Sequence, residues 1–552
     1  MRDQDIYAVQ LRDRYDALKG ARSNWERSWA EIIDYVIPHR GPVYRPSEVD
    51  GEQRVLQIYD STAVEGLKIA AAGMFAFTCP PSQPWFSLLA VDRRVRSSPA
   101  LSKWYGEVAE EIRTALLESN FYQQVHEAFL DLESVGTGCL YSEEDPEKGN
   151  GHLVFNSHGV SEYVIDANYE GFIDTVFRYV EFTARQAVQK FGEDALGDEI
   201  REALKDPKRP NRRFEFLHFV GPNEEFDKAR KDSRGKRFRS VWIDYKYKYI
   251  VREGGYEEMP YHVCRLDKSS GELYGRSSAS RVLPTIKLVN AQQRTLLKAG
   301  QKAVDPPVLL PSDGSVSSWR NDAGAINYWN GANRDAKPES WRFEGQLQIG
   351  IEMIRDNQSV IMEAFNAHLF NALALAPTKG MTATEVHERV DEKLTLLAPL
   401  IARLQSELFT SVIGRVYNIL DRAGRLPDRP VEADRPEDFQ VAYLGKLAQA
   451  LRQTNVNGLL ASLQAMSPFF EGHPEILDNI DMDEAILEIM RANSVPEKLI
   501  RSAASKLMLR TARLEQERAR MELEAADTGS KALQRTAKRP EDGSPAQMAM
   551  QQ

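Results

Sequence analysis

Between Gln346 and Arg422 the chain reads as a helix, a loop of small residues and a second, longer helix, and this order of parts constrains the fold more than any other segment. In the first helix, apolar residues recur in alternating steps of four and three, which forms a seam of heptad type. The seam consists of Leu347, Ile351, Ile354, Ile361 and Phe365, with Gln358 interrupting it. Such a seam suits side-by-side packing, so the pattern predicts a helix that associates with another helix.

The loop NALALAPTKG contains Pro377 and Gly380 and carries one charge, on Lys379. Immediately after it, MTATEV predicts a helix start with a capping box. In that box the Thr382 hydroxyl accepts a hydrogen bond from the Glu385 amide, and the Glu385 side chain reaches back.

The second helix of this segment is expected to be kinked. Its apolar face continues past Pro399, and a proline inside a helix produces a kink because it has no N–H to donate. Gly424 and Pro427 supply the chemistry that ends a helix. The apolar face consists of Val386, Val390, Leu397, Ile401, Leu404 and Leu408.

The pattern of residues 277–304 predicts another long helix with two distinct faces. Residues spaced by seven or four positions lie on nearly the same side of a helix, and both the apolar and the basic residues follow such spacings. The segment between this helix and the one at Gln346 is rich in Gly, Ser, Asn and Asp. It is too long for an ordinary connection within one domain. The apolar face of the helix holds Val282, Ile286, Val289 and Leu296, and the opposite, basic face holds Lys287, Arg294, Lys298 and Lys302.

The N-terminal half of the chain predicts helices followed by an antiparallel sheet. Ala70–Gly73 form a small-residue face on the second helix, which permits close packing against a neighbour. The stretch SVWIDYKYKYIV alternates in the way typical of one half-buried strand. The helical patterns cover residues 1–37, 60–77, 99–134 and 183–192, and strand patterns dominate residues 137–265.

Helices are expected again after Pro436. The final long helix opens with a capping box from Ser494 to Glu497 and runs to about Ala526. Residues 527–552 lack an apolar face and are expected to be disordered. The whole pattern predicts an α+β protein that is mainly α.

Composition describes an ordinary soluble protein with a large core, since 42% of the residues are hydrophobic and 28% are charged. The net charge of −10 argues against a general nucleic-acid binder, whose footprint is a basic excess. Three cysteines without paired spacing fit a reducing compartment and give neither a disulfide framework nor a zinc site. The N-terminus has no signal-peptide pattern, and Pro80, Pro81 and Pro84 break the uncharged stretch 69–91, so no membrane span is expected.

No enzyme signature survives inspection, so neither a catalytic residue, a metal site nor a cofactor is predicted. A GxxxxGK[ST] loop is missing from the sequence, and GTGCL at Gly136 lacks the third glycine of a dinucleotide loop, which favours a turn. His387–Glu388 lacks the second histidine of a zincin. Asp481 and Asp483 resemble half of a calcium loop, but Asp481 is better interpreted as a helix cap.

Several short motifs in one register resemble the portal, or head–tail connector, family of short-tailed bacteriophages. Near Pro399 these are MTATEV followed by ER, and RLQSEL. The resemblance spans roughly residues 1–500, and motifs in one order are far more specific than any alone. The others are YDSTA at Tyr59, PPSQPWFSL at Pro80, MPYHVCRLDKSSGELYGRS at Met259 and DPP at Asp305.

The resemblance implies a portal fold with wing, stem, clip and a helical crown and barrel. The expected parts are a wing at 1–276, stem helix 1 at 277–310, a clip at 311–345, stem helix 2 at 346–370 and a tunnel loop at 371–381. A long kinked helix at 382–435 returning to the wing, a crown at 436–495, a barrel helix at 496–526 and a disordered tail at 527–552 complete the list.

The resemblance also implies a function without enzyme activity. A dodecameric ring at one vertex of the capsid would serve as the conduit for packaging and ejecting the genome, in a virion whose proteins are made in the host cytoplasm. Implied partners are double-stranded DNA without sequence preference, the terminase large subunit, a tail adaptor protein, the major capsid and scaffolding proteins, and internal core or ejection proteins. The alternative is a ring-forming tail adaptor or scaffold without DNA passage.

The family pattern assigns candidate roles to individual residues. Thr378 and Lys379 of the tunnel loop would meet DNA, although Lys379 can also cap a helix end. The seam residues of the Gln346 helix would join neighbouring subunits. Trp319, Tyr328 and Trp329 would anchor partners at the clip or form the clip's own core between subunits.

Two groups of basic residues keep open interpretations. The stripe of Lys287, Arg294, Lys298 and Lys302 either lines the channel or pairs with acidic residues such as Glu352 and Glu363. The basic runs at 201–213 and 228–239 form either a solvated rim or a contact with DNA packaged around the portal, and the solvated rim is favoured.

Overall fold

The computed structural model of the chain divides into two compact units. Unit 1 comprises residues 1–87, 108–427 and 441–454, and unit 2 comprises 88–107, 428–440 and 455–552. Described residues are 3–40, 58–91, 98–145, 147–205, 211–230, 232–304, 308–309, 320, 326, 339–340, 347–374, 397–430, 439–444, 456, 458–460, 462–465, 481–492 and 503–537.

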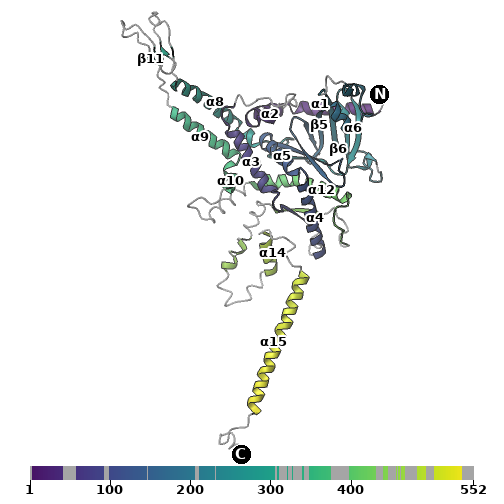
Figure 1. Cartoon of the computed structure of the whole chain (residues 1–552), viewed down its shortest axis with the longest axis vertical. Coiled ribbons are helices and arrows are strands. Elements are labelled where there is room, and N and C mark those ends of the chain that lie inside the picture. Colours follow the sequence, from purple (N-terminus) through teal and green to yellow (C-terminus); the bar gives the residue numbers. More distant parts are fainter. Residues whose placement is uncertain are drawn as a thin grey trace, which may run out of the picture. The chain divides into compact units, whose positions relative to one another are not determined.

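A five-stranded antiparallel sheet with the strand order β4-β5-β6-β7-β8 is the largest sheet that the structure describes. Helix α1 (Asp3–Ala21) covers one face through Ala8, Leu11 and Tyr15, and two short helices cover the other face. Figure 1 shows this sheet in unit 1. The elements are β4 (Tyr163–Ala167), β5 (Ile173–Thr183), α6 (Ala184–Phe191), α7 (Asp198–Lys205), β6 (Arg213–Pro222), β7 (Phe238–Asp244) and β8 (Tyr249–Tyr256).

The predicted single helix over residues 1–37 is wrong, because the structure has α1 and then α2 (Ser23–Val36), separated at Arg22. The Arg22 side chain is buried and donates to the carbonyl oxygens of Val160 and Tyr163, at 3.1 and 2.5 Å. Its Nε also donates to Glu26 at 2.7 Å. The contacts of Arg22 with Val160 and Tyr163, which lie far along the chain, interrupt the helix at this residue.

The predicted single strand at 240–251 is also wrong, because this stretch is the hairpin of β7 and β8. The Asp244 carboxylate accepts from the Tyr247 amide at 2.8 Å, and the Asp244 carbonyl accepts from the Lys248 amide at 2.9 Å. Lys248 has a φ of 57°. An aspartate whose side chain bonds the backbone ahead can close a turn without glycine.

A second antiparallel sheet has the order β3-β2-β9, built from β2 (Thr137–Glu144), β3 (Leu153–His158) and β9 (Tyr261–Arg265). On its edge strand β3, the backbone of Phe155 is hydrogen-bonded by the side-chain amide of Asn120. This amide donates to the Phe155 carbonyl and accepts from the Phe155 amide, each at 2.8 Å. Such pairing protects an exposed strand edge. The GTGCL motif is no dinucleotide loop: Gly136 ends α5 with a φ of 85°, and the rest of the motif lies in strand β2, in agreement with its predicted strand context.

The expected helix at 99–134 is two helices, α4 (Pro99–Glu118) and α5 (Phe121–Val135). The other expected helices agree closely with α3 (Thr62–Thr78), whose first amide donates to Asp60 at 3.0 Å, and with α6, which has the Thr183–Gln186 capping box. Helix α7 was not predicted; it occupies the start of the first basic run.

Two long helices of unit 1 lie side by side and form a helical arm (Figure 1). They are α8 (Ser278–Val304), as predicted, and α9 (Leu347–Ala364). In the part of the chain that connects α8 to α9, the short strands β10 (Val308–Leu309) and β11 (Glu339–Ser340) pair with each other in antiparallel fashion. Helix α10 (Ala367–Ala374) follows α9, so residues 371–374 are helical although they were expected in a loop.

The expected kinked helix is helical over residues 397–422, with a π-helical turn, η5 (Gln405–Phe409), between residue 404 and α12 (Thr410–Arg422). Such a turn with wider backbone bonding is a recognised cause of helix bending. The helix ends before Gly424, which has a φ of 68°, as predicted. The Thr382–Glu385 capping box lies outside the described residues.

Unit 2 is mainly helical where it is described, with α14 (Met482–Ala492) and α15 (Ala503–Ala537). Asp481 caps α14, since its carboxylate accepts from the amides of Asp483 and Glu484 at 3.0 and 3.1 Å. Residues 527–537 are helical, although disorder was expected from 527. The Ser494–Glu497 capping box lies outside the described ranges.

The chain also forms two short strands, β1 (Phe86–Ala90) and β12 (Phe439–Tyr443), and neither was predicted. Helices dominate the described chain, with antiparallel sheets beside them, so the predicted α+β, mainly α class is confirmed. Within the described ranges, every helix is too short or too polar to cross a lipid bilayer.

Candidate functional site

The helical arm is the part of the described chain in which most predicted site residues gather. Its helix α9 packs against α8 and against α3, and α10 packs against α3. Three residues of the predicted seam are buried in this packing. Ile354 and Ile361 of α9 are 5% and 1% exposed, and Phe365, which directly follows α9, is 0% exposed. The apolar face is therefore covered in large part by helices of the same chain, and its role between subunits stays a prediction.

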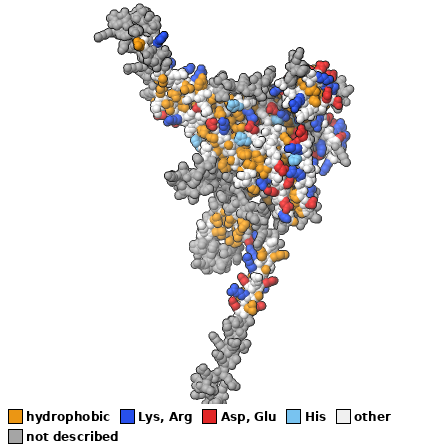
Figure 2. Space-filling model, viewed as in Figure 1, with side chains coloured by type: hydrophobic (Ala, Val, Ile, Leu, Met, Phe, Trp, Pro, Cys, Tyr) orange, Lys and Arg blue, Asp and Glu red, His pale blue; other side chains and the backbone are white. Residues whose placement is uncertain are grey.

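The opposite face of α9 is open. Ile349, Met353 and Val360 are 52%, 51% and 48% exposed, and their spacing places them on one stripe, away from the buried seam. We call these three residues the outer stripe. Figure 2 shows hydrophobic side chains gathered on the arm. An apolar stripe on a helix indicates a surface that another element covers.

The basic stripe of α8 is divided between paired and exposed residues. Lys287 pairs with Glu31 of α2 at 2.7 Å, rather than with the expected Glu352 or Glu363. The Arg294 guanidinium lies 5.7 Å from the centre of the Tyr59 ring. Lys298 and Lys302 are exposed at the far end of α8. The structure therefore leaves the outer half of the stripe open to solvent.

Several candidate residues lie outside the described part of the chain. These are Thr378 and Lys379 of the predicted tunnel loop, and Trp319, Tyr328 and Trp329 of the predicted clip. Their roles stay predictions.

The π-helical turn η5 is held on strand β9 by a buried ion pair. The Arg265 guanidinium donates to Glu407 Oε1 at 2.6 Å through Nη2 and 3.1 Å through Nε, and the Arg265 amide donates to Glu407 Oε2 at 2.9 Å. The two side chains are 3% and 12% exposed. A further Nη2 contact reaches the Gly171 carbonyl at 3.2 Å. One carboxylate thus fixes the position of η5 on strand β9.

A hydrogen-bond network continues this attachment along α12. His262 is buried, with one ring nitrogen 2.8 Å from the Ser142 hydroxyl and the other 2.7 Å from the Ser411 hydroxyl. Arg415 donates to the Ser142 hydroxyl at 3.0 Å and pairs with Glu258 at 3.4 Å. Burial and the nearby Arg415 lower the pKa of His262 to about 3, so the imidazole is neutral. The sequence gives no signal for this network, because its members are far apart in the chain.

Two buried carboxyl groups lie on α5. Burial raises the pKa of Glu133 to about 7, against the opposing effects of a hydrogen bond from Ser278 and the charge of Arg281. Burial also raises the pKa of Asp131 to about 7, although Arg40 lies 2.9 Å away and opposes the shift. Both groups face the protein interior, and neither lines the cavity described below.

Most of the described basic side chains in the runs at 201–213 and 228–239 pair with acidic residues. In the first run, Arg212 pairs with Glu199, which also pairs with Lys246, and Arg201 pairs with Asp198 at 3.8 Å. Charges neutralised in this way attract a polyanion weakly, which supports the solvated rim over a DNA contact. The pairs of the second run are Arg230–Asp232, Arg234–Glu225, Lys236–Glu257 and Arg239–Glu253.

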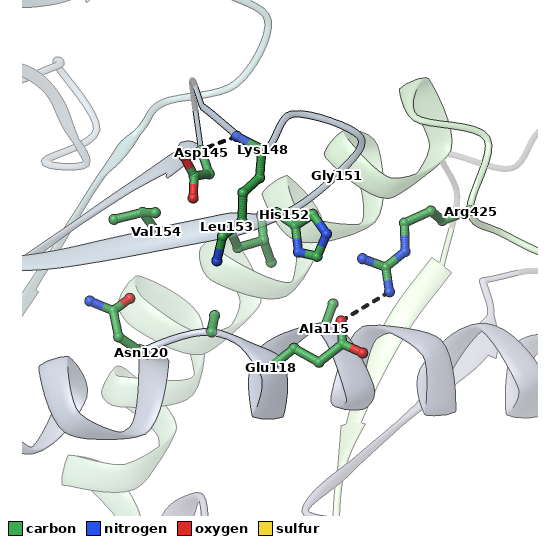
Figure 3. Close-up of a pocket in the computed structure, with 11 residues that line it drawn as sticks. Ala115, Glu118, Asn120, Asp145, Lys148, Gly151, His152, Leu153, Val154 and Arg425 are labelled. Atoms are coloured by element: carbon green, nitrogen blue, oxygen red, sulfur yellow. Dashed lines mark hydrogen bonds and ion pairs between the residues drawn. The ribbon is translucent and has the colours of Figure 1, made fainter. Parts of the chain in front are cut away.

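A cavity of about 200 Å³ in unit 1 lies between the β2–β3 hairpin and the helices α4, α5 and α12 (Figure 3). Arg425 at its edge pairs with Glu118 at 3.3 Å and with Glu111 at 2.9 Å. Lys148 and His152 also line it. The volume is below that of ordinary ligand sites, and Arg425 is already paired with Glu118, so the cavity gives no catalytic arrangement.

Comparison with known proteins adds independent findings. Residues 8–500 match the family described as "Bacteriophage head to tail connecting protein". Over 529 residues, the chain is 27% identical to the "Probable portal protein" of Bordetella phage BPP-1, with 94% of both chains covered. It is 25% identical over 529 residues to the "Portal protein" of Salmonella phage epsilon15, again with 94% of each chain covered.

Proposed function

Because this chain belongs to the family of bacteriophage head-to-tail connecting proteins, we propose that it is a portal protein. Copies of it would form a ring, expected to be a dodecamer, at one vertex of the capsid, through which the genome enters and leaves. The observation that carries the proposal is the match to two portal proteins across 94% of the chain. The open apolar stripe on α9 supports it, because a ring needs a surface on which a second copy can pack.

The parts of the portal are assigned from the family pattern. The N-terminal helices and sheets would form the wing, and α8 and α9 would form the stem, with the clip between them at 311–345. The segment after α10 would be the tunnel loop. Residues 436–495 would form the crown, and α15 would lie in a barrel of such helices, since Leu507, Leu514 and Met521 recur every seven residues and are more than half exposed.

The ring would act as a passive conduit. The clip, with Trp319, Tyr328 and Trp329 as anchors, would bind the terminase large subunit during packaging and the tail adaptor afterwards, because aromatic residues contribute most to binding energy. The wing and crown would meet the capsid, scaffolding and internal core proteins. The protein would be a component of the virion, made in the host cytoplasm.

Electron microscopy of the purified protein tests the proposal directly. Rings of about twelve subunits with an axial bore wide enough for a DNA duplex are expected. The other candidate, a ring-forming adaptor or scaffold without DNA passage, predicts rings that lack a bore of that width. A monomer at all concentrations would contradict both candidates.

The outer stripe should be required for ring assembly. In the variant Met353→Asp/Val360→Asp, two charges would be buried without partners at the subunit contact, which costs several kcal/mol per site. We expect a folded monomer by circular dichroism and the loss of rings by native mass spectrometry. Substitution of the buried Ile354 and Ile361, in contrast, would disrupt the fold of the single chain. Ser359→Asp, at a neighbouring exposed position, should still form rings; rings in the double variant would exclude the stripe from the contact.

Lys379 should contact the DNA backbone in the tunnel. A ring repeats this ammonium once per subunit, and each contact would be weak and sensitive to salt, which suits a duplex that has to slide. No base recognition is expected, because phosphate contacts carry no sequence information. Lys379→Glu should leave rings intact and lower the DNA content per head or the ejection efficiency at least twofold. Lys103→Glu, at an exposed lysine of α4 outside the candidate channel residues, is the matched charge reversal. Wild-type values for Lys379→Glu would remove Lys379 from the proposed contact.

A further inference from the structure

Helix α3 carries two glycines, Gly66 and Gly73, seven residues apart and therefore on the same face. A Cβ atom placed on Gly73 would lie 2.3 Å from Phe370 Cγ, and one placed on Gly66 would lie 2.9 Å from Phe365 Cδ2. Carbon atoms in contact stay about 3.5 Å or more apart, so neither ring could keep its place beside an alanine. The two glycines thus form two notches, each of which receives one phenylalanine.

These phenylalanines lie on either side of the joint between α9 and α10. Asn366 at the joint has a φ of 52°, and the Phe370 amide donates to the Asn366 carbonyl at 3.1 Å. Phe365 is 0% and Phe370 6% exposed, and the Phe77 ring of α3 stacks on Phe370 at 5.9 Å between centroids. The joint is therefore held in place by side chains packed on α3.

A third contact sets the alignment along α3. Near its start, Asp60 accepts a hydrogen bond from Gln358 of α9 at 2.6 Å. The contacts Asp60–Gln358, Gly66–Phe365 and Gly73–Phe370 follow the same order in both segments. Helix α3 therefore determines where α9 and α10 lie along it, and the last contact occurs one turn before α10 ends at Ala374.

We propose that the Gly73–Phe370 contact positions the start of the segment that carries Lys379, so that α3 is a positioning element for the DNA contact. This inference rests on the proposed function. Phe370 is a positioning residue, since it would act through the segment that follows α10. Gly66 has a weaker effect, because the atom nearest to its missing Cβ is at the edge of the Phe365 ring, which can shift further than a ring's Cγ.

The test is a double-mutant cycle with two readouts in full-length protein. Gly73→Ala should accelerate amide hydrogen exchange in residues 367–374 at least tenfold and at least halve the DNA content of heads that contain a ring. Gly66→Ala should show a smaller change in both. In the Phe370→Ala background, Gly73→Ala should have no further effect on exchange, because the ring that the methyl group displaces is gone.

Two controls separate positioning from a general loss of stability. Gly300→Ala in α8 adds a methyl group in open space and should change neither readout. Val241→Ala weakens the buried sheet far from α10 along the chain, and its heads should fill normally. If Gly73→Ala does not fold, Gly73→Ala/Phe370→Ala should fold as well as Phe370→Ala alone; failure of the pair to do so would overturn the contact.

The two proposals fail in different ways. Unchanged exchange in Gly73→Ala would overturn the contact itself. Faster exchange with normally filled heads, while Lys379→Glu heads fill poorly, would overturn only the positioning role. Normal filling in both variants would overturn the DNA contact of Lys379 and, with it, the positioning role.

Discussion

Replacement of Glu407 by alanine is expected to lower the free energy of unfolding by about 3 kcal/mol or more. Glu407 is the carboxylate that pairs with the guanidinium of Arg265, and it also accepts a hydrogen bond from the Arg265 amide. Arg265 is 3% exposed, so the variant would leave a buried cation without its partner. Breaking a buried pair in this way costs about 3–5 kcal/mol, more than the pair contributes relative to an apolar replacement.

The measurement is thermal unfolding of wild type and variant, with a decrease of several degrees in Tm expected for Glu407→Ala. The matched control is Glu65→Ala, which removes an exposed partner of Lys68, where the pair is 3.6 Å apart and both side chains are more than half exposed. An exposed pair contributes about 1 kcal/mol or less, so this control should change Tm little. Equal Tm values for Glu407→Ala and wild type would show that the pair does not hold η5 on β9.

This prediction concerns function as well as stability. The helix that contains η5 follows the segment that carries Lys379 in the chain, and Glu407 attaches this helix to strand β9 of unit 1. The other end of that segment follows α10, which is attached to α3 through Phe370. The described residues on either side of 375–396, the stretch that contains Lys379, are thus held on unit 1 by contacts of different kinds, one ionic and one of packing.

Features that depend on neighbouring residues could be predicted from the sequence. The Thr183–Gln186 capping box, the Asp481 cap, the helix end at Gly424 and the long helix α8 all follow from residues within a few positions of each other. The small face ending at Gly73 predicted close packing against a neighbour, which the structure confirms with Phe370.

Features set by distant contacts could not be predicted. The break at Arg22 depends on the carbonyl oxygens of Val160 and Tyr163, more than a hundred residues away. Within the candidate site, the heptad seam correctly indicated a helix that packs laterally. A periodic pattern gives the direction of a face but not the identity of its partner, so it did not reveal that α3 and α8 of the same chain cover that seam.

Glu133→Gln is expected to stabilise the protein at pH 8 and to leave it nearly unchanged at pH 5. Burial raises the pKa of Glu133 from 4.5 to about 7, so the folded chain holds this proton more tightly than the unfolded chain does. Below pH 4.5 both states are protonated, and the folded state has no penalty. As the pH rises from 4.5 to 7, the unfolded state releases its proton first, so stability falls, by up to about 3 kcal/mol once the buried carboxylate is charged.

Glutamine keeps the shape of the side chain and removes the charge, so the variant should escape that loss. The measurement is the difference in the free energy of unfolding between Glu133→Gln and wild type at pH 5 and pH 8. This difference cancels the opposite contribution of the buried histidines, since His158, with a pKa of about 4, and His262 destabilise the fold at low pH in both proteins. Glu65→Gln is the exposed control on α3. A variant that is less stable than wild type at pH 8 would show that the charged carboxylate is held by Ser278 and Arg281 strongly enough to offset its burial, and that Glu133 anchors the start of α8 as an anion.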